Sequence, residues 1–218
     1  DDARTNFGGY KPNNSTYAFS GLINVRQALA ESSNIVHVKI MKELGPANSI
    51  EFLKTLGIDV PKKQEGLALA LGTPDVSPLQ MAVAYAAIAN DGVYIEPTFY
   101  TKIEDSEGNI ILEPTQETRR VMSAENAYVL QNLLTAPVRS GTAGACYMSN
   151  MDVGAKTGST EEYRDRWLCG FTPYYTAATW FGFDFSERPN TSANNARTIW
   201  ANIMKPIHKN LATKRFDR

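Results

Sequence analysis

The feature that most constrains the fold of this chain is a change of pattern near residue 150. Before it, apolar residues recur mostly at helical spacing. After it come three short segments rich in aromatic and β-branched residues and separated by turn residues: 152–159, 166–172 and 174–184. Such segments are typical of consecutive antiparallel strands. Helices followed by a strand meander predict an α+β fold in which an antiparallel β-sheet is flanked by helices.

A helix is expected after the last strand, from about Ser192. Apolar residues recur there at i, i+3, i+4, i+7, i+8 and i+11, which predicts a single stripe that docks on the sheet. Pro206 should end or kink this helix. The residues of the stripe are Ala196, Ile199, Trp200, Ile203, Met204 and Ile207.

The chain before residue 150 divides into an irregular lead-in over residues 1–20 and a mainly helical part over 21–145. Within the helical part, Ser106-Glu107-Gly108 separates two segments that we expect to pair as a hairpin or as extended segments. The helix that begins at Ser77-Pro78 is apolar almost all round, so we expect it to be buried. The expected helices cover about 23–31, 34–44, 47–56, 78–89 and 123–134.

Composition limits the classes of function. The 218 residues are 43% hydrophobic and 21% charged, which suits one domain, or one domain with a small appendage, around a sizeable core. The net charge is −1 and there is no long basic run, which argues against nucleic acid as the main partner. No apolar run approaches the ~20 residues that cross a bilayer. The chain opens in polar residues without a signal peptide, so we expect a mature chain or a piece of a longer protein.

Cysteine and histidine are too sparse to suggest a metal centre. Cys146 and Cys169 do not form a CxxC motif, and His37 and His208 lie far apart. Since a zinc site needs clustered ligands, no metal site is expected. The spacing leaves open whether the cysteines form one disulfide or stay as buried free thiols.

The stretch Lys156-Thr157-Gly158-Ser159 has the groups of an anion receptor. The hydroxyls of Thr157 and Ser159 donate hydrogen bonds, Lys156 supplies positive charge, and Gly158 lets a ligand approach the backbone. A backbone N–H of the same strand can also face a developing oxyanion. Four such common residues also occur together by chance, so the stretch alone does not define a site.

A second candidate, Ser32-Ser33-Asn34, lies at the break between two helical patterns. Ser and Asn are ordinary helix caps, and Ser33 or Asn34 can simply begin the following helix. The alternative is that the break presents the Ser32 hydroxyl and the Asn34 amide to a cleft.

Together the two motifs resemble a known family. Ser-x-Asn precedes Lys-Thr-Gly by about 120 residues, the order found in penicillin-binding proteins and class A β-lactamases. Longer segments, which are more specific than either motif, resemble the transpeptidase domain of class A (bifunctional) penicillin-binding proteins, and the resemblance covers nearly the whole chain. These segments are 22–45, 67–97, 138–143 and 153–184. The resemblance implies the β-lactamase/transpeptidase-like fold of the penicillin-recognising serine acyltransferases, with residues 1–218 as the C-terminal portion of a transpeptidase domain.

The resemblance also implies roles for individual residues. Ser32 would relay a proton to or from the leaving amine, and Asn34 would hydrogen-bond the substrate backbone. Lys156 would provide the electrostatic field and pair with the Ser32 hydroxyl. Thr157 and Ser159 would bind the terminal carboxylate of D-Ala, beside Gly158, and the Ser159 N–H would form half of an oxyanion hole. Asp165 and Arg166 fit the family pattern too, either by orienting the turn or by touching substrate.

The family's first motif, Ser-x-x-Lys, is missing, because no serine of this chain has lysine three positions on. The simplest explanation is that an upstream segment, absent from these residues, carries the nucleophile. We then expect this chain to expose apolar surface or to contain a cavity, and to be inactive alone.

The leading hypothesis is therefore an enzyme, a serine-type D-Ala-D-Ala transpeptidase that cross-links peptidoglycan stem peptides and is acylated by β-lactams. It would need no cofactor and would act on the extracytoplasmic face of the bacterial cell membrane, held by an anchor outside these residues. A β-lactamase or β-lactam sensor shares the fold, although no segment resembles the class A deacylating-glutamate loop. A non-catalytic peptidoglycan-binding module is the third hypothesis, favoured only by the missing first motif.

Overall fold

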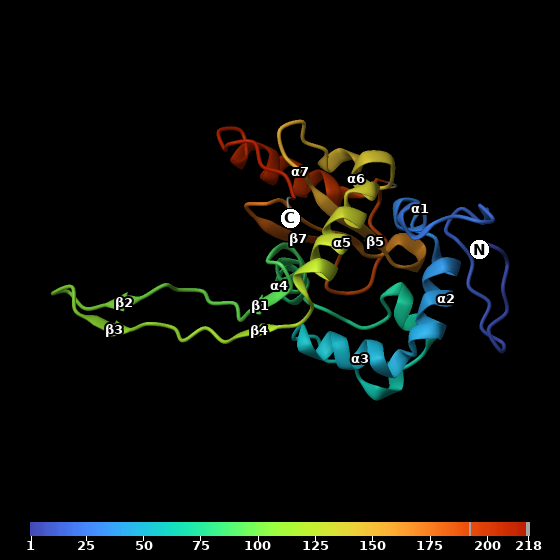
Figure 1. Cartoon of the computed structure of the whole chain (residues 1–218), viewed down its shortest axis with the longest axis horizontal. Helices are drawn as coiled ribbons and strands as arrows, with labels where there is room; N and C mark the ends of the chain where they lie inside the picture. The colour runs from blue at the N-terminus through green and yellow to red at the C-terminus, as the bar shows by residue number, and fades with distance from the viewer. Residues whose placement is uncertain (192, 217–218) are drawn as a thin grey trace.

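The computed structural model describes residues 1–191 and 193–216 and confirms an α+β architecture. Its centre is a three-stranded antiparallel sheet in the order β5–β6–β7 (Figure 1). One face of the sheet packs against α7, and the other packs against α4 and α5. The strands are β5 (Gly154–Ser159), β6 (Arg166–Phe171) and β7 (Thr176–Phe181). All three expected strands are therefore confirmed, and β5, which carries the Lys-Thr-Gly stretch, forms one edge.

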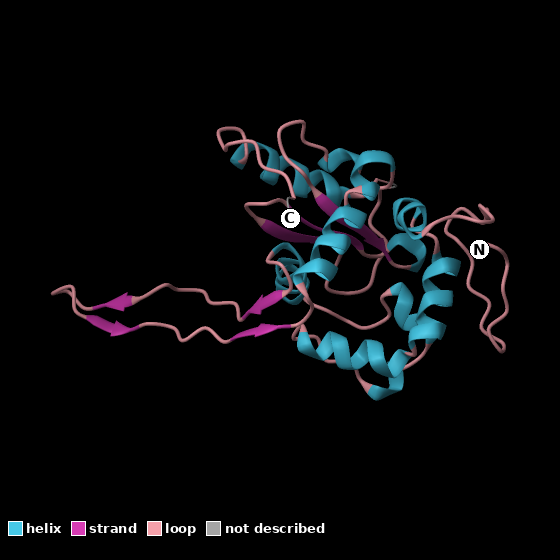
Figure 2. Cartoon of the chain, in the orientation of Figure 1, coloured by secondary structure: helices cyan, strands magenta, loops and turns pink. Residues whose placement is uncertain are grey.

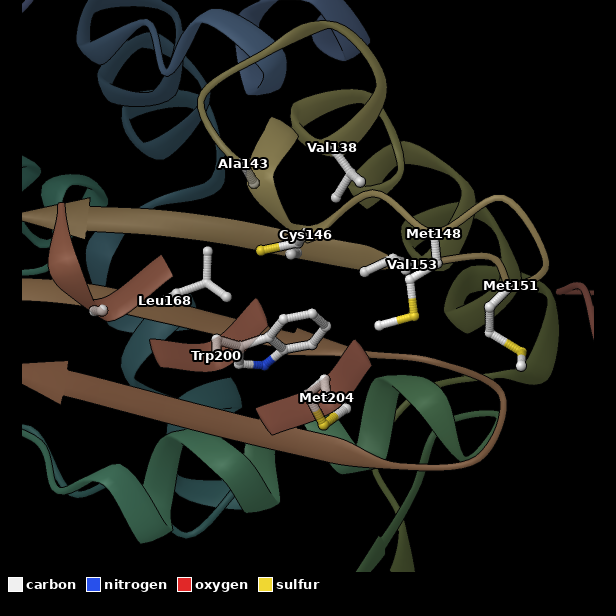
Figure 3. Packing of buried hydrophobic residues seen from close by; sticks show 11 residues of the cluster. Val138, Ala143, Cys146, Met148, Met151, Val153, Leu168, Trp200 and Met204 are labelled. Carbon is white, nitrogen blue, oxygen red and sulfur yellow. The ribbon is translucent and has the colours of Figure 1, made fainter. Parts of the chain in front are cut away.

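The main core lies between the sheet and α7 (Asn195–Ile207). Trp200 is fully buried there, and its indole N–H donates to the Ala177 carbonyl at 3.1 Å. Figure 3 shows Trp200 and Met204 of α7 in one cluster with Leu168 of the sheet.

The predicted stripe on α7 is only half right. Trp200 and Met204 are buried with Ala196, whereas Ile199, Ile203 and Ile207 are 38%, 52% and 48% exposed. Successive positions on a helix turn by about 100°, so the isoleucines, one position earlier than Trp200 and Met204, lie beside the buried row. The helix ends one residue after Pro206, as predicted, and the expected start at Ser192 lies outside the described residues.

The helical part follows the predicted boundaries closely, because each boundary has a local signal. Ser77 and Gln80 form a complete capping box at α4, and Ser123 caps α5. The expected burial of α4 is met only in part: Ala84 and Ala87 pack with Leu56 and Tyr94 away from the sheet, and Ile88 packs with Phe171 of the sheet. The α-helices are α1 (Val25–Glu31), α2 (Asn34–Leu44), α3 (Pro46–Thr55), α4 (Pro78–Ala89), α5 (Ala124–Leu134) and α6 (Ala136–Ser140). The 3-10 turns are η1 (Lys62–Gln64), η2 (Leu67–Leu71), η3 (Gly144–Cys146) and η4 (Glu161–Tyr163).

A long hairpin extends from the body of the molecule between α4 and α5 (Figure 2). At its base β1 (Val93–Ile95) pairs with β4 (Thr118–Arg120), and near its tip β2 (Ile103–Glu104) pairs with β3 (Ile110–Leu112). The pairing around Ser106-Glu107-Gly108 is as predicted, whereas the short, charged β4 had no sequence signal.

Candidate active site

The Ser32-Ser33-Asn34 corner joins α1 to α2. Ser33 is the N-cap of α2, and its Oγ accepts from the Val36 N–H at 3.2 Å. Ser32 ends α1 in the left-handed region, at φ 58° and ψ 45°. The capping interpretation is therefore correct for Ser33, while the turn leaves the Ser32 side chain for a different contact.

The second part of the site is the edge strand β5. Hydrogen-bonded and non-hydrogen-bonded pairs alternate along an antiparallel ladder. The Thr160 N–H donates to the Asp165 carbonyl at 3.2 Å, so the next pair, Ser159 with Arg166, is of the non-hydrogen-bonded kind. The backbone N–H of Ser159 consequently points away from β6, toward the open edge. By the same alternation the Thr157 backbone also faces that edge.

The two parts meet through Lys156. Its Nζ donates to the Ser32 Oγ at 2.7 Å and to the Thr157 carbonyl at 3.0 Å. The structure thus brings together residues that are 124 positions apart in the sequence. Both motifs that the sequence analysis singled out contribute to one site.

Burial governs the protonation of Lys156. The desolvation of its ammonium lowers the pKa of Lys156 from 10.5 to about 8. The side chain is therefore largely charged at neutral pH but loses its proton at mildly alkaline pH. A cation in this state can attract a carboxylate and can also exchange a proton with the Ser32 hydroxyl.

The Lys156–Ser159 part of β5 lines a cavity of about 660 Å³. Lys156, Thr157, Gly158 and Ser159 form its polar side, and apolar residues of the segment from η2 to α4 form much of the rest. A Cβ added at Gly158 would lie 3.1 Å from the Cβ of Trp167, so glycine also relieves crowding between the strands.

Asn34 lies at the start of α2, where its Nδ2 donates to the Asn13 carbonyl at 2.7 Å.

Two neighbours of the site were not identified from the sequence. The Thr142 hydroxyl lies 2.7 Å from the Thr157 hydroxyl, and the Thr142 carbonyl accepts from Arg197 at 3.1 Å. The only signal for Thr142 was its place in the family-like segment 138–143.

His37 lies one turn after Ser33 and contacts the Ser33 carbonyl through Nδ1. Burial lowers the pKa of His37, and the charge of Lys156 adds to this effect.

Asp165 and Arg166 do not contact the Lys156–Ser32 pair. Asp165 organises the turn after β5, because its carboxylate accepts from the Thr160 hydroxyl at 3.0 Å and from the Trp180 indole N–H at 2.9 Å. Arg166 is buried under the ring of Tyr163, with 4.3 Å from Cζ to the ring centroid.

The two cysteines remain separate. Cys146 and Cys169 are free thiols, and both are buried. Over residues 1–191 and 193–216, no group of three or more His, Cys, Asp or Glu side chains is placed to hold a metal ion. In the same residues no helix has the length and hydropathy needed to cross a bilayer.

Solved structures identify this architecture as the transpeptidase and β-lactamase-like fold. Penicillin-binding protein 1A from Haemophilus influenzae superposes with a TM-score of 0.86 at 25% identity, over 100% of this chain and 39% of that chain. PonA1 from Mycobacterium tuberculosis, solved in complex with penicillin V, superposes with a TM-score of 0.84 at 23% identity, over 99% of this chain and 64% of that chain.

Sequence similarity defines the family. The family model "Penicillin binding protein transpeptidase domain" matches residues 2–208. Penicillin-binding protein 1A of Clostridium botulinum is 36% identical over 215 residues, which cover 96% of this chain and 26% of that protein. The chain therefore belongs to the penicillin-binding protein transpeptidase domain family, as the resemblance predicted, and it spans about a quarter of the length of such relatives.

Proposed function

We propose that the intact protein is a D,D-transpeptidase that cross-links peptidoglycan stem peptides through an acyl-serine intermediate. The observation that carries this proposal is the 2.7 Å hydrogen bond from Lys156 Nζ to Ser32 Oγ beside an open strand edge. It places a cation, a relay hydroxyl and strand hydroxyls around one space, which suits a peptide that ends in a carboxylate.

The proposed roles follow from these positions. A serine nucleophile attacks the carbonyl of the penultimate D-Ala, and the oxyanion that forms is stabilised by the Ser159 N–H. Ser32, held by Lys156, relays the proton released by the attacking serine to the departing amine of the terminal D-Ala. Thr157 and Ser159 bind the carboxylate of that D-Ala. An amine of a second stem peptide then attacks the acyl-serine, which forms the cross-link and frees the serine.

Asn34 has a separate role in holding the donor peptide. Its Nδ2 uses one hydrogen for the Asn13 carbonyl, and in the described part of the chain its Oδ1 has no hydrogen-bond partner. This leaves one N–H and one acceptor for the amide group of a bound peptide.

We further propose that the nucleophile comes from a segment outside these 218 residues. The chain has no Ser-x-x-Lys motif and spans 26% of the Clostridium botulinum relative. The cavity beside Lys156 has a mostly apolar lining, which suits a helix that presents a serine and a lysine at the polar end. The exposed isoleucines of α7, on the opposite side of the sheet, are a second apolar face that another part of the intact protein can cover.

We place the intact protein on the extracytoplasmic face of the bacterial cell membrane, where its peptidoglycan substrate would be, with an anchor outside this chain. β-Lactams would acylate the same serine, because they mimic the terminal D-Ala-D-Ala.

The decisive experiment is mass spectrometry of the full-length protein after penicillin treatment. One acylated serine, within a Ser-x-x-Lys motif that precedes this chain, is the expected result. Rapid multiple turnover of a chromogenic cephalosporin would support a β-lactamase instead. A full-length protein that lacks the motif and takes up no penicillin would support a non-catalytic peptidoglycan-binding module.

A further inference from the structure

The lead-in over residues 1–20 folds back onto the Ser32-Ser33-Asn34 corner, beside α1 and α2 (Figure 1). Its anchor is Asp2, which is 1% exposed. One oxygen of the Asp2 carboxylate accepts from the Ser33 hydroxyl at 2.7 Å and from Asn14 Nδ2 at 2.9 Å. The other accepts from the Ser20 N–H at 2.7 Å and from Asn14 Nδ2 at 3.0 Å. A buried carboxylate is thereby satisfied by groups from three places in the chain.

Asn14 connects this carboxylate to the first turn of α2. Its side chain is 7% exposed, and Nδ2 donates to the Ala18 carbonyl at 2.8 Å as well as to Asp2. Its Oδ1 accepts from the Asn34 N–H at 2.9 Å and from the Ile35 N–H at 3.4 Å. These N–H groups lie at a helix start, where the helix itself provides no acceptor. Both ends of the Asn14 amide are therefore in use.

The two contacts fix the corner immediately after Ser32. Ser32 adopts a left-handed conformation, which is unfavourable for a residue other than glycine and persists only where the surroundings hold it. Asp2 holds the side chain of Ser33, and Asn14 holds the backbone of Asn34. The Asn13 carbonyl additionally holds the Asn34 amide. The orientation of the Ser32 hydroxyl toward Lys156 depends on these neighbours.

We propose that Asp2 and Asn14 are positioning residues for the reaction: they form a clamp that keeps the Ser32 hydroxyl in line with Lys156 and the Asn34 amide in the substrate groove. This inference rests on the proposed function and adds two residues to its machinery. Neither residue touches the reacting atoms, so both act through the corner.

The test compares four versions of the full-length protein: unmodified, Asn14→Asp, the double variant Asp2→Asn with Asn14→Asp, and Ser15→Ala. Asn14→Asp places two carboxylates against each other, and like charges at this distance repel. The double variant restores one carboxylate and one amide at the clamp. Ser15→Ala is the matched control, because it removes an exposed hydroxyl of the same lead-in, next to Asn14.

Two measurements are made on each protein. The first is the rate constant of labelling by a fluorescent penicillin, together with the fraction of molecules finally labelled. The second is amide hydrogen exchange at residues 33–37, with the α7 segment 196–204 as the reference. A misplaced site lowers the rate constant of labelling, whereas misfolding lowers the fraction of molecules that are labelled.

We expect Asn14→Asp to lower the labelling rate constant at least about tenfold, since small displacements of catalytic groups have effects of this size, while the labelled fraction is unchanged. Exchange should rise at 33–37 and not at 196–204. The double variant should recover most of the rate, and Ser15→Ala should match the unmodified protein.

The clamp is overturned if Asn14→Asp reduces the labelled fraction and leaves the rate of the labelled molecules unchanged, because that is a purely structural effect. Unchanged exchange at 33–37 also overturns it. If the unmodified protein takes up no penicillin, the proposed function fails, and the exchange measurement still decides whether Asp2 and Asn14 hold the corner.

Discussion

The Lys156 ammonium and the Ser32 hydroxyl are joined by a 2.7 Å hydrogen bond, although five α-helices, α2 to α6, and the hairpin separate them in the chain. The contact couples the edge strand β5 to the turn between α1 and α2. Ser32 therefore has its donor fixed before any substrate binds. Such preorganisation is what a proton relay needs, because the relay group does not have to be reoriented during the reaction.

Replacing Ser32 with alanine tests the relay. We expect Ser32→Ala to slow penicillin acylation of the full-length protein by about 10² to 10⁴, the usual contribution of a positioned proton-transfer group. The measurement is the second-order rate constant of labelling. Ser106→Ala, at the exposed tip of the hairpin, is the control and should leave the rate unchanged. An unaltered rate in Ser32→Ala would exclude the relay role.

The lowered pKa of Lys156 predicts a pH dependence. Charged Lys156 binds the Ser32 hydroxyl and, in the proposed function, attracts the substrate carboxylate, so acylation should decline as pH rises through about 8. If only the charged form acts, the decline approaches about tenfold for each pH unit. The measurement is the labelling rate from roughly pH 6 to roughly pH 10, a range that extends on both sides of the lowered pKa.

The lowered pKa of Lys156 also predicts a pH dependence of stability, in the direction opposite to that of acylation. Burial lowers the pKa of Lys156 from 10.5 to about 8, so between these pH values the unfolded chain binds more protons than the folded chain. Stability should therefore rise with pH across this window, while the cost of burying the charge is fully present below it.

Lys156→Arg keeps its charge at every pH, so it should lose the alkaline decline of acylation. An alkaline decline in the acylation rate that persists in Lys156→Arg would be caused by the titration of another group.

The sequence predicted most boundaries of the helices and strands because their signals are local. The Ser77-Pro78 start of α4 and the Ser123 cap of α5 act within a few residues, so they are legible without knowledge of the fold. The stripe on α7 shows the limit of this reasoning. Helical periodicity defines an apolar arc, but the neighbours decide which part of it is buried, and Ile203 lies outside that part.

Only part of the candidate site could be predicted from the sequence. The pairing of Ser32 with Lys156 came from family resemblance, since no local pattern carries information across 124 positions. Asp2 and Asn14 lie in a segment that reads as an irregular lead-in, and their hydrogen bonds depend on how that segment folds back. Thr142 was missed for the same reason, because a single hydroxyl has no periodicity.

Thr142 leads to a prediction about the carboxylate receptor. Its hydroxyl shares a 2.7 Å hydrogen bond with Thr157, which orients the Thr157 hydroxyl at the edge of the groove. We expect Thr142→Val to weaken penicillin binding by about 1 kcal/mol, the net contribution of one hydrogen bond, and Thr142→Ser to retain most of it. The measurement is the saturation of the acylation rate with penicillin concentration. A loss in the serine variant with none in the valine variant would point to packing of the methyl group instead.

The exposed face of α7 provides a test of the proposed upstream segment. Ile203 is 52% exposed, whereas Trp200 on the same helix is fully buried. Trp200→Ala should destabilise the domain by about 3–5 kcal/mol, because it opens a cavity in the main core. If the rest of the full-length protein covers the outer face of α7, Ile203→Asn should also cost about 1–3 kcal/mol, because a polar amide would be buried. Ile111→Asn, at a hairpin position that is 66% exposed, should have little effect. Denaturant unfolding of the full-length variants measures all three, and an Ile203→Asn protein as stable as the Ile111→Asn control would mean that this face of α7 is open to solvent.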